Sequence, residues 1–154
     1  MLPMSCDLQG LSVLVTRPVK QAYSLCELIE RHHGRPIRFP AIDITAAADP
    51  EQARASLATA GQADMLIFVT ANAVEYAFPL LPDILPGDLV IGAIGRATAR
   101  QLDEYGLEPG LLPRSGYDSE GLLALDELQD MGGKQVVIVR GNGGRSKLRD
   151  ELEQ

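Results

Sequence analysis

Three turns in the sequence carry small polar residues or glycines where a predicted strand passes into a predicted helix. Hydroxyl, amide and backbone N–H groups in such turns cap the helix, and the same groups can hydrogen-bond an anionic ligand. In an open parallel sheet, ligands bind beyond the carboxyl ends of the strands, where these turns are expected. Three such turns on one edge of the sheet are stronger evidence for a ligand site than any one of them alone. The candidate ligand-binding residues are Thr70, Ala71, Asn72, Gly95, Thr98 and Ser119.

A glycine-rich loop, "RGNGGR" at residues 140–145, follows the last predicted strand. It lacks the Gly-Lys-Ser/Thr ending of a Walker phosphate loop, and Ser146 stands where a dinucleotide fingerprint has its third glycine. The loop is therefore either a flexible turn or an anion site built from backbone N–H groups at a helix start. The failed glycine patterns count against a nucleotide-binding enzyme.

The other reactive side chains predict no catalytic or metal site. His32 and His33 are adjacent, so on a helix their side chains point about 100° apart and cannot share a metal on one face. They fit the cationic end of a helix better. Cys26 lies on an apolar stripe and is expected in the core. No Ser–His–Asp set stands out, and the first strand ends in Thr-Arg instead of the paired acids of a phospho-acceptor domain.

Composition and charge narrow the classes of function. The chain has 154 residues and a formal charge of −7, from 14 Lys and Arg against 21 Asp and Glu. This disfavours nucleic-acid binding, which needs a basic face, although a few arginines can still hold a polyanionic ligand. No apolar run approaches the roughly 18 residues of a membrane span. Cys6 and Cys26 form no CxxC spacing and no signal-peptide pattern is visible, so we expect a reduced cytoplasmic protein.

Strands and helices alternate along the chain. Apolar, β-branched runs predict strands in "SVLVT", "DMLIFV", "DLVIGAIG" and "KQVVIVRG", with a short strand in "PGLLP". These runs lack apolar–polar alternation, which is typical of parallel strands buried on both faces. Helical patterns follow them, one of them over "YDSEGLLALDELQDMGG". The expected fold class is α/β, a parallel sheet with helices on both faces, as in a flavodoxin-like three-layer domain.

Caps and prolines predict several helix boundaries. Asp49 is expected as an N-cap with Pro50 at the first helical position. Gly34 is expected as a glycine C-cap after the cationic "RHH". Pro79 should shorten the helix that follows Asn72.

The last strand and helix resemble a second copy of the first. With an offset of 123 residues, both copies have a buried strand ending in arginine, a turn and a helix. The last predicted helix has no stop signal, unlike the others. We therefore expect this chain to be the front part of a protein about twice its size. The paired positions include Val13 and Val136, Arg17 and Arg140, Leu25 and Leu148, and Ile29 and Leu152.

Five motifs in order carry a resemblance to a known family. They are "VLVTRP", "FVTANAV", "IGRATARQLDEYGL", "SEGLLAL" and "VVIVRGNGGRSKL", and together they cover essentially the whole chain. In this order and spacing the chain resembles the uroporphyrinogen-III synthases. The family forms two α/β domains from two repeats, in a swapped arrangement. The resemblance implies that residues 1–35 belong to a second, mostly missing domain, and that residues 36–154 form a domain completed by 134–154.

The resemblance also implies an activity. The family cyclises hydroxymethylbilane, a linear tetrapyrrole polycarboxylate, to uroporphyrinogen III, with loss of water and inversion of the fourth pyrrole ring. It implies no cofactor and no metal. The six candidate residues named at the outset match the family's substrate-facing motifs, whereas Arg17 and Arg140 are expected to be structural.

One family feature lies outside this chain. The tyrosine near the departing hydroxyl would follow Gln154, and Tyr117 does not match its motif. We therefore expect the chain by itself to be inactive or nearly so, and either poorly ordered at its first unit or a domain-exchanged dimer, whereas the full-length form should be a monomer. The alternative is a non-catalytic flavodoxin-like module that binds a small anion or a protein partner.

Overall fold

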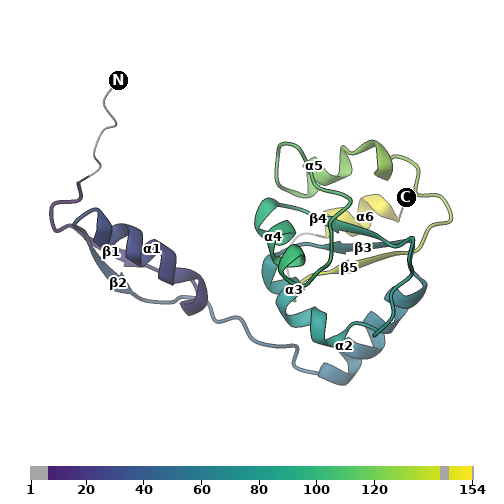
Figure 1. The fold of residues 1–154 in the computed structure, drawn as a ribbon, viewed down its shortest axis with the longest axis horizontal. Coiled ribbons are helices and arrows are strands. Elements are labelled where there is room, and N and C mark those ends of the chain that lie inside the picture. Colours follow the sequence, from purple (N-terminus) through teal and green to yellow (C-terminus); the bar gives the residue numbers. More distant parts are fainter. Residues whose placement is uncertain (1–6, 143–145, 154) are drawn as a thin grey trace. The chain divides into compact units, whose positions relative to one another are not determined.

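The computed structural model describes residues 7–142 and 146–153, and it divides the chain into two compact units. The first unit ends at Thr45 and the second begins at Ala46 (Figure 1). This division lies later than the boundary expected between residues 35 and 36. The reason is that the segment after residue 35 forms a strand that pairs with the first strand of the chain.

The first unit is a parallel strand pair with one helix. Strand β1 (Ser12–Val15) leads into α1 (Val19–Arg31), which returns to β2 (Arg35–Arg38). Leu14 lies opposite Ile37 in the pair. The helix covers one face of the two strands, where Val15, Ala22, Cys26 and Ile29 form a small core.

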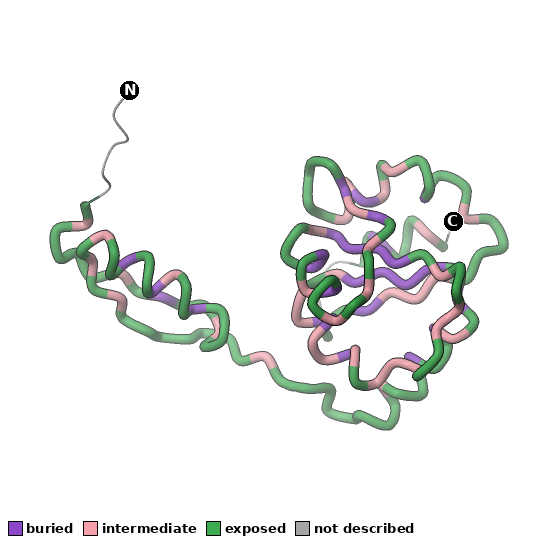
Figure 2. The backbone as a smooth tube through the Cα atoms, viewed as in Figure 1, coloured by how far each residue is buried: buried purple, intermediate pink, exposed green. Residues whose placement is uncertain are grey.

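The other face of this strand pair is exposed within the unit. Leu14 keeps 59% of its surface exposed, and Ile37 and Phe39 are exposed as well. Only Val15 is buried in β1, which was predicted to be buried on both faces. The prediction was wrong on this point because burial depends on a covering layer, and the described residues of the first unit supply only α1. Figure 2 shows most of β2 in green, the colour of exposed residues.

The turn after α1 also differs from expectation. His33, and not Gly34, takes the left-handed conformation (φ 57°). Gly34 is required for a different reason, which is close packing. A Cβ atom there would lie 2.7 Å from side-chain carbons of both Ile29 and Leu8.

The second unit is a three-stranded parallel sheet with helices on both faces, which confirms the predicted fold class. Its sheet order is β4–β3–β5, so the latest strand in sequence pairs with the earliest strand of this unit. In chain order its elements are α2 (Pro50–Leu57), β3 (Met65–Phe68), α3 (Ala71–Ala77), β4 (Val90–Ala93), α4 (Arg96–Glu104), α5 (Ser119–Leu123), β5 (Val136–Val139) and α6 (Lys147–Leu152). Single 3-10 turns lie at Ala58–Gln62, Phe78–Leu80 and Asp126–Leu128.

Central strand β3 separates two apolar layers. Leu66 and Phe68 face a core shared with α2, α3 and α4, whereas Met65 and Ile67 face a core shared with α5 and α6. All four side chains are buried. A strand buried on both faces has no polar side, which explains the unbroken apolar run in the sequence.

Several predicted boundaries hold and two elements are shorter than expected. Asp49 caps α2 through the N–H of Gln52 (3.0 Å), and α3 passes into a 3-10 turn at Pro79. The predicted helix over 117–133 is only the five residues of α5 followed by a 3-10 turn, because Leu125 has extended backbone (ψ 139°). The segment "PGLLP" makes one isolated bridge, between Leu111 and Gly92, since its flanking prolines cannot donate ladder hydrogen bonds.

Among the described residues, no helix is both long enough and apolar enough to span a membrane.

Candidate functional site

The carboxyl ends of the strands in the second unit lie side by side. The N–H of Val69 donates to the carbonyl of Val139 (3.0 Å), and that of Ile94 donates to the carbonyl of Phe68 (3.2 Å). The N–H of Ala93 donates to the carbonyl of Leu111 (2.8 Å). The turns that follow β5, β3, β4 and the Leu111 bridge therefore meet at one edge of the sheet, as the sequence predicted.

Thr70 forms the turn after β3. It has extended backbone and is the N-cap of α3, with its hydroxyl accepting a hydrogen bond from the N–H of Ala73 (3.1 Å). The residue is exposed, and Ala71 and Asn72 after it are half-buried. The first N–H groups of a helix have no acceptor within that helix. This turn therefore presents hydroxyl and N–H groups at the carboxyl edge, in line with both its capping role and ligand binding.

Gly95 forms the turn after β4 and is the N-cap of α4. Its φ of −150° is ordinary extended backbone, so glycine is not required there for conformation. A Cβ atom would meet the Cβ of Tyr117 at 3.5 Å, which is normal packing distance. Gly95 is half-buried, and the turn that carries Tyr117 packs beside its backbone.

Thr98 does not reach the surface of this edge. It lies on α4 with 4% of its surface exposed and packs within the helix layer. A hydroxyl in this position cannot contact a ligand without a rearrangement. Of the six candidates, Thr98 is the only one whose residue is buried.

The third turn leads into α5, where Asp118 is the N-cap. Its carboxylate accepts a hydrogen bond from the N–H of Gly121 (2.8 Å), so Ser119 is the first helical residue and not the cap. Gly121 packs directly on the preceding turn, since a Cβ atom there would lie 1.8 Å from the carbonyl oxygen of Gly116. The motif "SEG" thus needs glycine for close approach.

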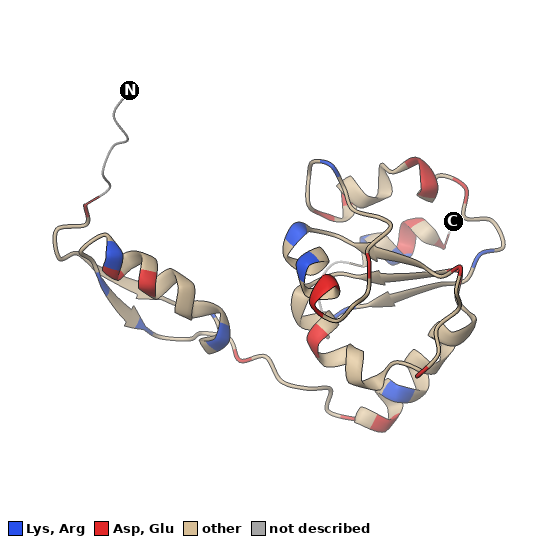
Figure 3. Cartoon of the chain, viewed as in Figure 1, with Lys and Arg blue, Asp and Glu red and all other residues tan. Residues whose placement is uncertain are grey.

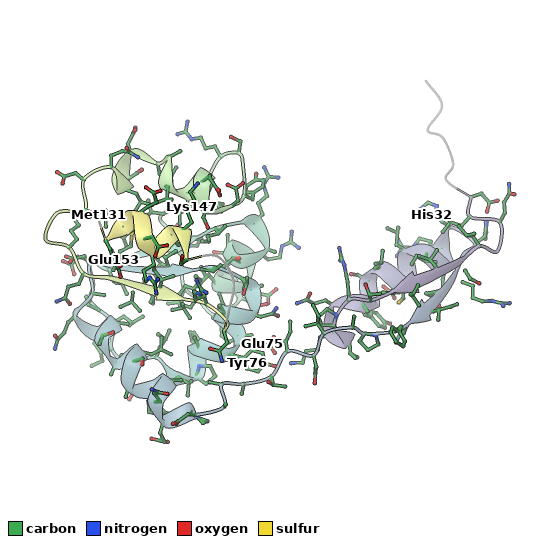
Figure 4. All side chains as sticks on the ribbon, turned by 180° about the vertical axis from the view of Figure 1, so that it is seen from behind. His32, Glu75, Tyr76, Met131, Lys147 and Glu153 are labelled. Atoms are coloured by element: carbon green, nitrogen blue, oxygen red, sulfur yellow. The ribbon has the colours of Figure 1, made fainter. Side chains whose placement is uncertain are left out.

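An ion pair ties α5 to α6. Lys147 Nζ lies 3.1 Å from a carboxylate oxygen of Glu120, and both side chains are partly exposed. Figure 4 shows Lys147 on the side of α6 that faces α5. Because α6 follows β5, this contact links the last βα segment of the chain to the turn that holds Ser119.

Two residues at the edge were not predicted from the sequence. The Cζ atom of Arg96 lies 5.0 Å from the centre of the Tyr117 ring, which is a cation–π contact. Arg96 is the first residue of α4, a helix on which Figure 3 shows both basic (blue) and acidic (red) positions. Sequence spacing could not reveal the pair, because the two positions lie far apart along the chain. The arginine directly after the glycine of "IGRAT" was the available signal.

The predicted glycine-rich loop can be followed only in part. Arg140 is exposed and its Nε donates to the carbonyl of Gly141 (3.4 Å). Gly143, Gly144 and Arg145 lie outside the described residues, as does Cys6. Beyond the loop, the hydroxyl of Ser146 donates to Asp150, and this bond together with Arg149 holds the pKa of Asp150 below its usual value.

The remaining side chains form no further reactive cluster within the described ranges. His33 Nδ1 lies 3.3 Å from a carboxylate oxygen of Asp7, and Cys26 is buried in the core of the first unit, as predicted. Residues 7–142 and 146–153 contain no group of three or more His, Cys, Asp or Glu side chains that could hold a metal.

The chain is similar in sequence to proteins named uroporphyrinogen-III synthase. The uroporphyrinogen-III synthase of Escherichia coli is 34% identical over 152 residues, which cover 92% of this chain and 59% of the relative. The enzyme of the same name from Proteus mirabilis is 31% identical over 147 residues, covering 94% of this chain and 74% of the relative. The chain thus spans about three fifths of the E. coli relative.

Solved structures share the fold. The wild-type uroporphyrinogen III synthase of the extremely thermophilic bacterium Thermus thermophilus has a TM-score of 0.59 at 19% identity, over 94% of this chain and 57% of that chain. A mutant of the same enzyme has a TM-score of 0.64 at 20% identity, with the same coverage.

A family comparison agrees with these similarities. The model of the family described as "Uroporphyrinogen-III synthase HemD" matches residues 24–154, which is most of the chain and includes all three turns at the sheet edge. The chain belongs to the uroporphyrinogen-III synthase family.

Proposed function

We propose that the full-length protein containing this chain is a uroporphyrinogen-III synthase, a hydro-lyase that cyclises hydroxymethylbilane to uroporphyrinogen III. The observation that carries the proposal is the meeting of the strand-end turns at Thr70 and Gly95 on one sheet edge, with Tyr117 of the turn before Ser119 packed beside Gly95. The substrate is a linear tetrapyrrole with eight carboxylates. Hydroxyls and backbone N–H groups at this edge are donors that suit carboxylates.

This reaction depends more on how the enzyme positions the substrate than on acid–base side chains. The lone pair of a pyrrole nitrogen expels the hydroxyl group, which leaves with a proton as water. The substituted carbon of the fourth ring then attacks the resulting electrophilic methylene carbon. The bond from that ring carbon to its former bridging methylene breaks, and the released methylene bonds to the other α-carbon of the same ring, which loses its proton. The ring is thereby inverted and the macrocycle closed. The enzyme must hold the chain so that this attack outcompetes simple closure, which is a gain from orientation. A site rich in donors and without paired acids fits that task.

The roles of the six candidates follow from their placement. Thr70, Ala71, Asn72, Gly95 and Ser119 are proposed to face substrate carboxylates. Thr98 is proposed to act indirectly, by packing α4 so that Gly95 lies at the edge, because its side chain is buried.

The two units are proposed to belong to different domains of the whole protein. In this arrangement β5 and α6 complete the domain built by residues 46–133, and the first unit completes a domain made mostly by later residues. The exposed Leu14 and Ile37 support this, since they form a face that a further layer could cover. The chain alone is then proposed to be inactive and to assemble, if at all, as a domain-exchanged dimer, with the full-length form a monomer.

A cytoplasmic location is also proposed, on the basis of the cysteine spacing. The second candidate function is a non-catalytic module that binds a small anion or a protein partner. It is supported by the capped turns at Thr70, Gly95 and Asp118, whose hydroxyl and N–H groups would serve a non-catalytic anion-binding module equally well.

The decisive experiment compares the full-length protein with the 154-residue chain. Both receive enzymatically generated hydroxymethylbilane, and the oxidised porphyrin products are separated by isomer. We expect mainly the type III isomer from the full-length protein and mainly type I from the shorter chain. Type I alone from a folded full-length protein would exclude the synthase and favour the binding module.

A further inference from the structure

We propose that Arg96, held against the ring of Tyr117, binds one carboxylate of the tetrapyrrole and so helps to orient it. The inference rests on the proposed function and extends its site by a charged residue. Arg96 lies next to Gly95 in sequence, and Tyr117 lies two residues before Ser119. The pair thus bridges two of the three turns that face the substrate.

The geometry places the guanidinium on the aromatic ring. Arg96 Cζ is 5.0 Å from the ring centre, and the Cβ of Tyr117 lies 3.5 Å from the position of a Cβ at Gly95. The Tyr117 hydroxyl reaches back to the carbonyl of Arg114 (3.5 Å). Tyr117 is therefore supported on its own turn and serves as a surface on which the arginine side chain rests.

Stacking on a ring leaves the N–H groups at the edge of the guanidinium available. These N–H groups form a planar fork that matches a carboxylate with two parallel hydrogen bonds. Among the described residues, Arg96 makes no ion pair. Its charge is therefore not already neutralised by a protein carboxylate in this part of the chain.

The nearest acidic residues in sequence to Tyr117 have other partners. Asp118 accepts the N–H of Gly121 at 2.8 Å, and Glu120 pairs with Lys147 at 3.1 Å. In a protein with a net charge of −7, an arginine whose neighbouring acids are engaged elsewhere is a local attraction for a polyanion. This combination distinguishes Arg96 from a surface arginine that is already paired.

The two residues have separable roles. Arg96 contacts substrate, whereas Tyr117 acts through Arg96 and is a positioning residue. A phenylalanine at 117 keeps the ring face and should keep the effect, whereas a leucine removes it. A lysine at 96 keeps the charge but loses the planar fork, so it should restore binding only in part.

The test measures binding by the full-length protein of uroporphyrin III, a stable porphyrin with eight carboxylates, by fluorescence titration at low and high salt. We expect Arg96→Gln to weaken binding about tenfold, the loss expected for one charge-assisted pair, and to reduce its salt dependence. Arg96→Lys and Tyr117→Leu should each weaken it about threefold, and Tyr117→Phe should leave it unchanged. The control is Arg54→Gln, an exposed arginine in the last turn of α2, which leads to the opposite edge of the sheet.

The outcomes separate this inference from the proposed function. If the wild type forms the type III isomer and binds the porphyrin, but Arg96→Gln binds as tightly as Arg54→Gln does, the role of Arg96 is overturned and the synthase stands. If the folded wild type neither binds the porphyrin nor forms type III, both proposals fail. Thermal unfolding of each variant checks that a change in affinity does not come from loss of fold.

Discussion

The first βα segment of the chain and the last one share a sequence pattern but differ in burial. With the 123-residue offset, Val13 and Val15 of β1 face α1, and Val136 and Ile138 of β5 belong to the core under α5 and α6. The opposite faces diverge. Val137 packs against the core formed with α2, α3 and α4, whereas its counterpart Leu14 is 59% exposed.

This difference shows that the sequence of a βα segment determines what covers only one of the two faces of its strand. The helix that follows the strand covers one face, because the two are joined by a short turn. The second face is covered only by elements far away in sequence, which β5 finds in α2–α4 and β1 does not find within the described part of the first unit. The same apolar residues are therefore core in one unit and surface in the other.

The core of the second unit should respond most strongly to substitution. Phe68 is fully buried between β3 and the α2–α4 layer, so Phe68→Ala should destabilise this unit by about 3–5 kcal/mol. Phe39→Ala, at a position that is 63% exposed in the first unit, should change stability by less than about 0.5 kcal/mol. Hydrogen exchange resolved by residue measures both. Equal losses of protection from the two substitutions would contradict the difference in burial between Phe68 and Phe39.

The next effect compares two closely packed glycines. At Gly121 a Cβ would overlap a backbone oxygen at 1.8 Å, whereas at Gly34 the contacts are longer, with side-chain carbons at 2.7 Å and the backbone oxygen of Ile29 at 3.1 Å. Gly121→Ala should therefore cost about 1–3 kcal/mol or displace α5, and Gly34→Ala should cost less. Gly61→Ala, where the nearest atom is 3.8 Å away, is the control. Urea unfolding would rank the three, and a larger loss at Gly34 would reverse the argument.

A matched pair tests the difference between the repeats directly. Val137→Ala should cost about 1 kcal/mol in the 154-residue chain, because Val137 packs against the α2–α4 core. Leu14→Ala should be close to neutral there, as expected for an exposed position. In the full-length protein Leu14→Ala should become costly if later residues cover this face. Chemical denaturation of both proteins measures the change, and a neutral result in both would argue against the proposed covering layer.

The two units also differ in how their helices are capped, and substitution of a cap should have a smaller effect on stability than substitution in the core. The Thr70 hydroxyl caps α3, whereas α1 begins after Pro18 and has no side-chain cap bond. Thr70→Ala should cost about 1 kcal/mol and also weaken porphyrin binding, and Thr70→Ser should retain both. Thermal unfolding and the porphyrin titration are the measurements. Retained binding in a stable Thr70→Ala variant would limit Thr70 to capping.

A carboxylate of the first unit should give the weakest signal. The N–H of Gln9 donates to Asp7 (2.9 Å), and this bond, helped by His33, holds the pKa of Asp7 below its usual 3.8. A carboxylate whose pKa is lowered on folding stabilises the folded state at any pH above its usual pKa. This stabilisation is lost as the pH falls through the lowered pKa of the folded state. Asp7→Asn should therefore weaken the first unit slightly at neutral pH and not at all in strong acid. Urea unfolding at the two pH values checks the sign.

Much of the site could be predicted from the sequence because it is local. The turn at Thr70 and the position of Gly95 follow from a strand run, a cap residue and a helix pattern that are contiguous. At the third turn the cap is Asp118 and not Ser119, since both types suit it and only the packing of Gly121 on Gly116 fixes the turn. The burial of Thr98 was not predicted. Its hydroxyl follows a glycine turn, and the residue type alone does not show whether the side chain points to the core or to the ligand edge.

The alternation of strands and helices, the parallel arrangement and the polar turns at strand ends could all be read from the amino-acid order, since each depends on neighbours within a few residues. Three features could be known only from the folded chain: which strands stand beside β3, which face of β1 stays exposed, and that Arg96 rests on Tyr117. Those features depend on residues far apart in the chain. The free energy that holds them together comes from burying their apolar surfaces against one another, and local sequence patterns do not show which residues will meet.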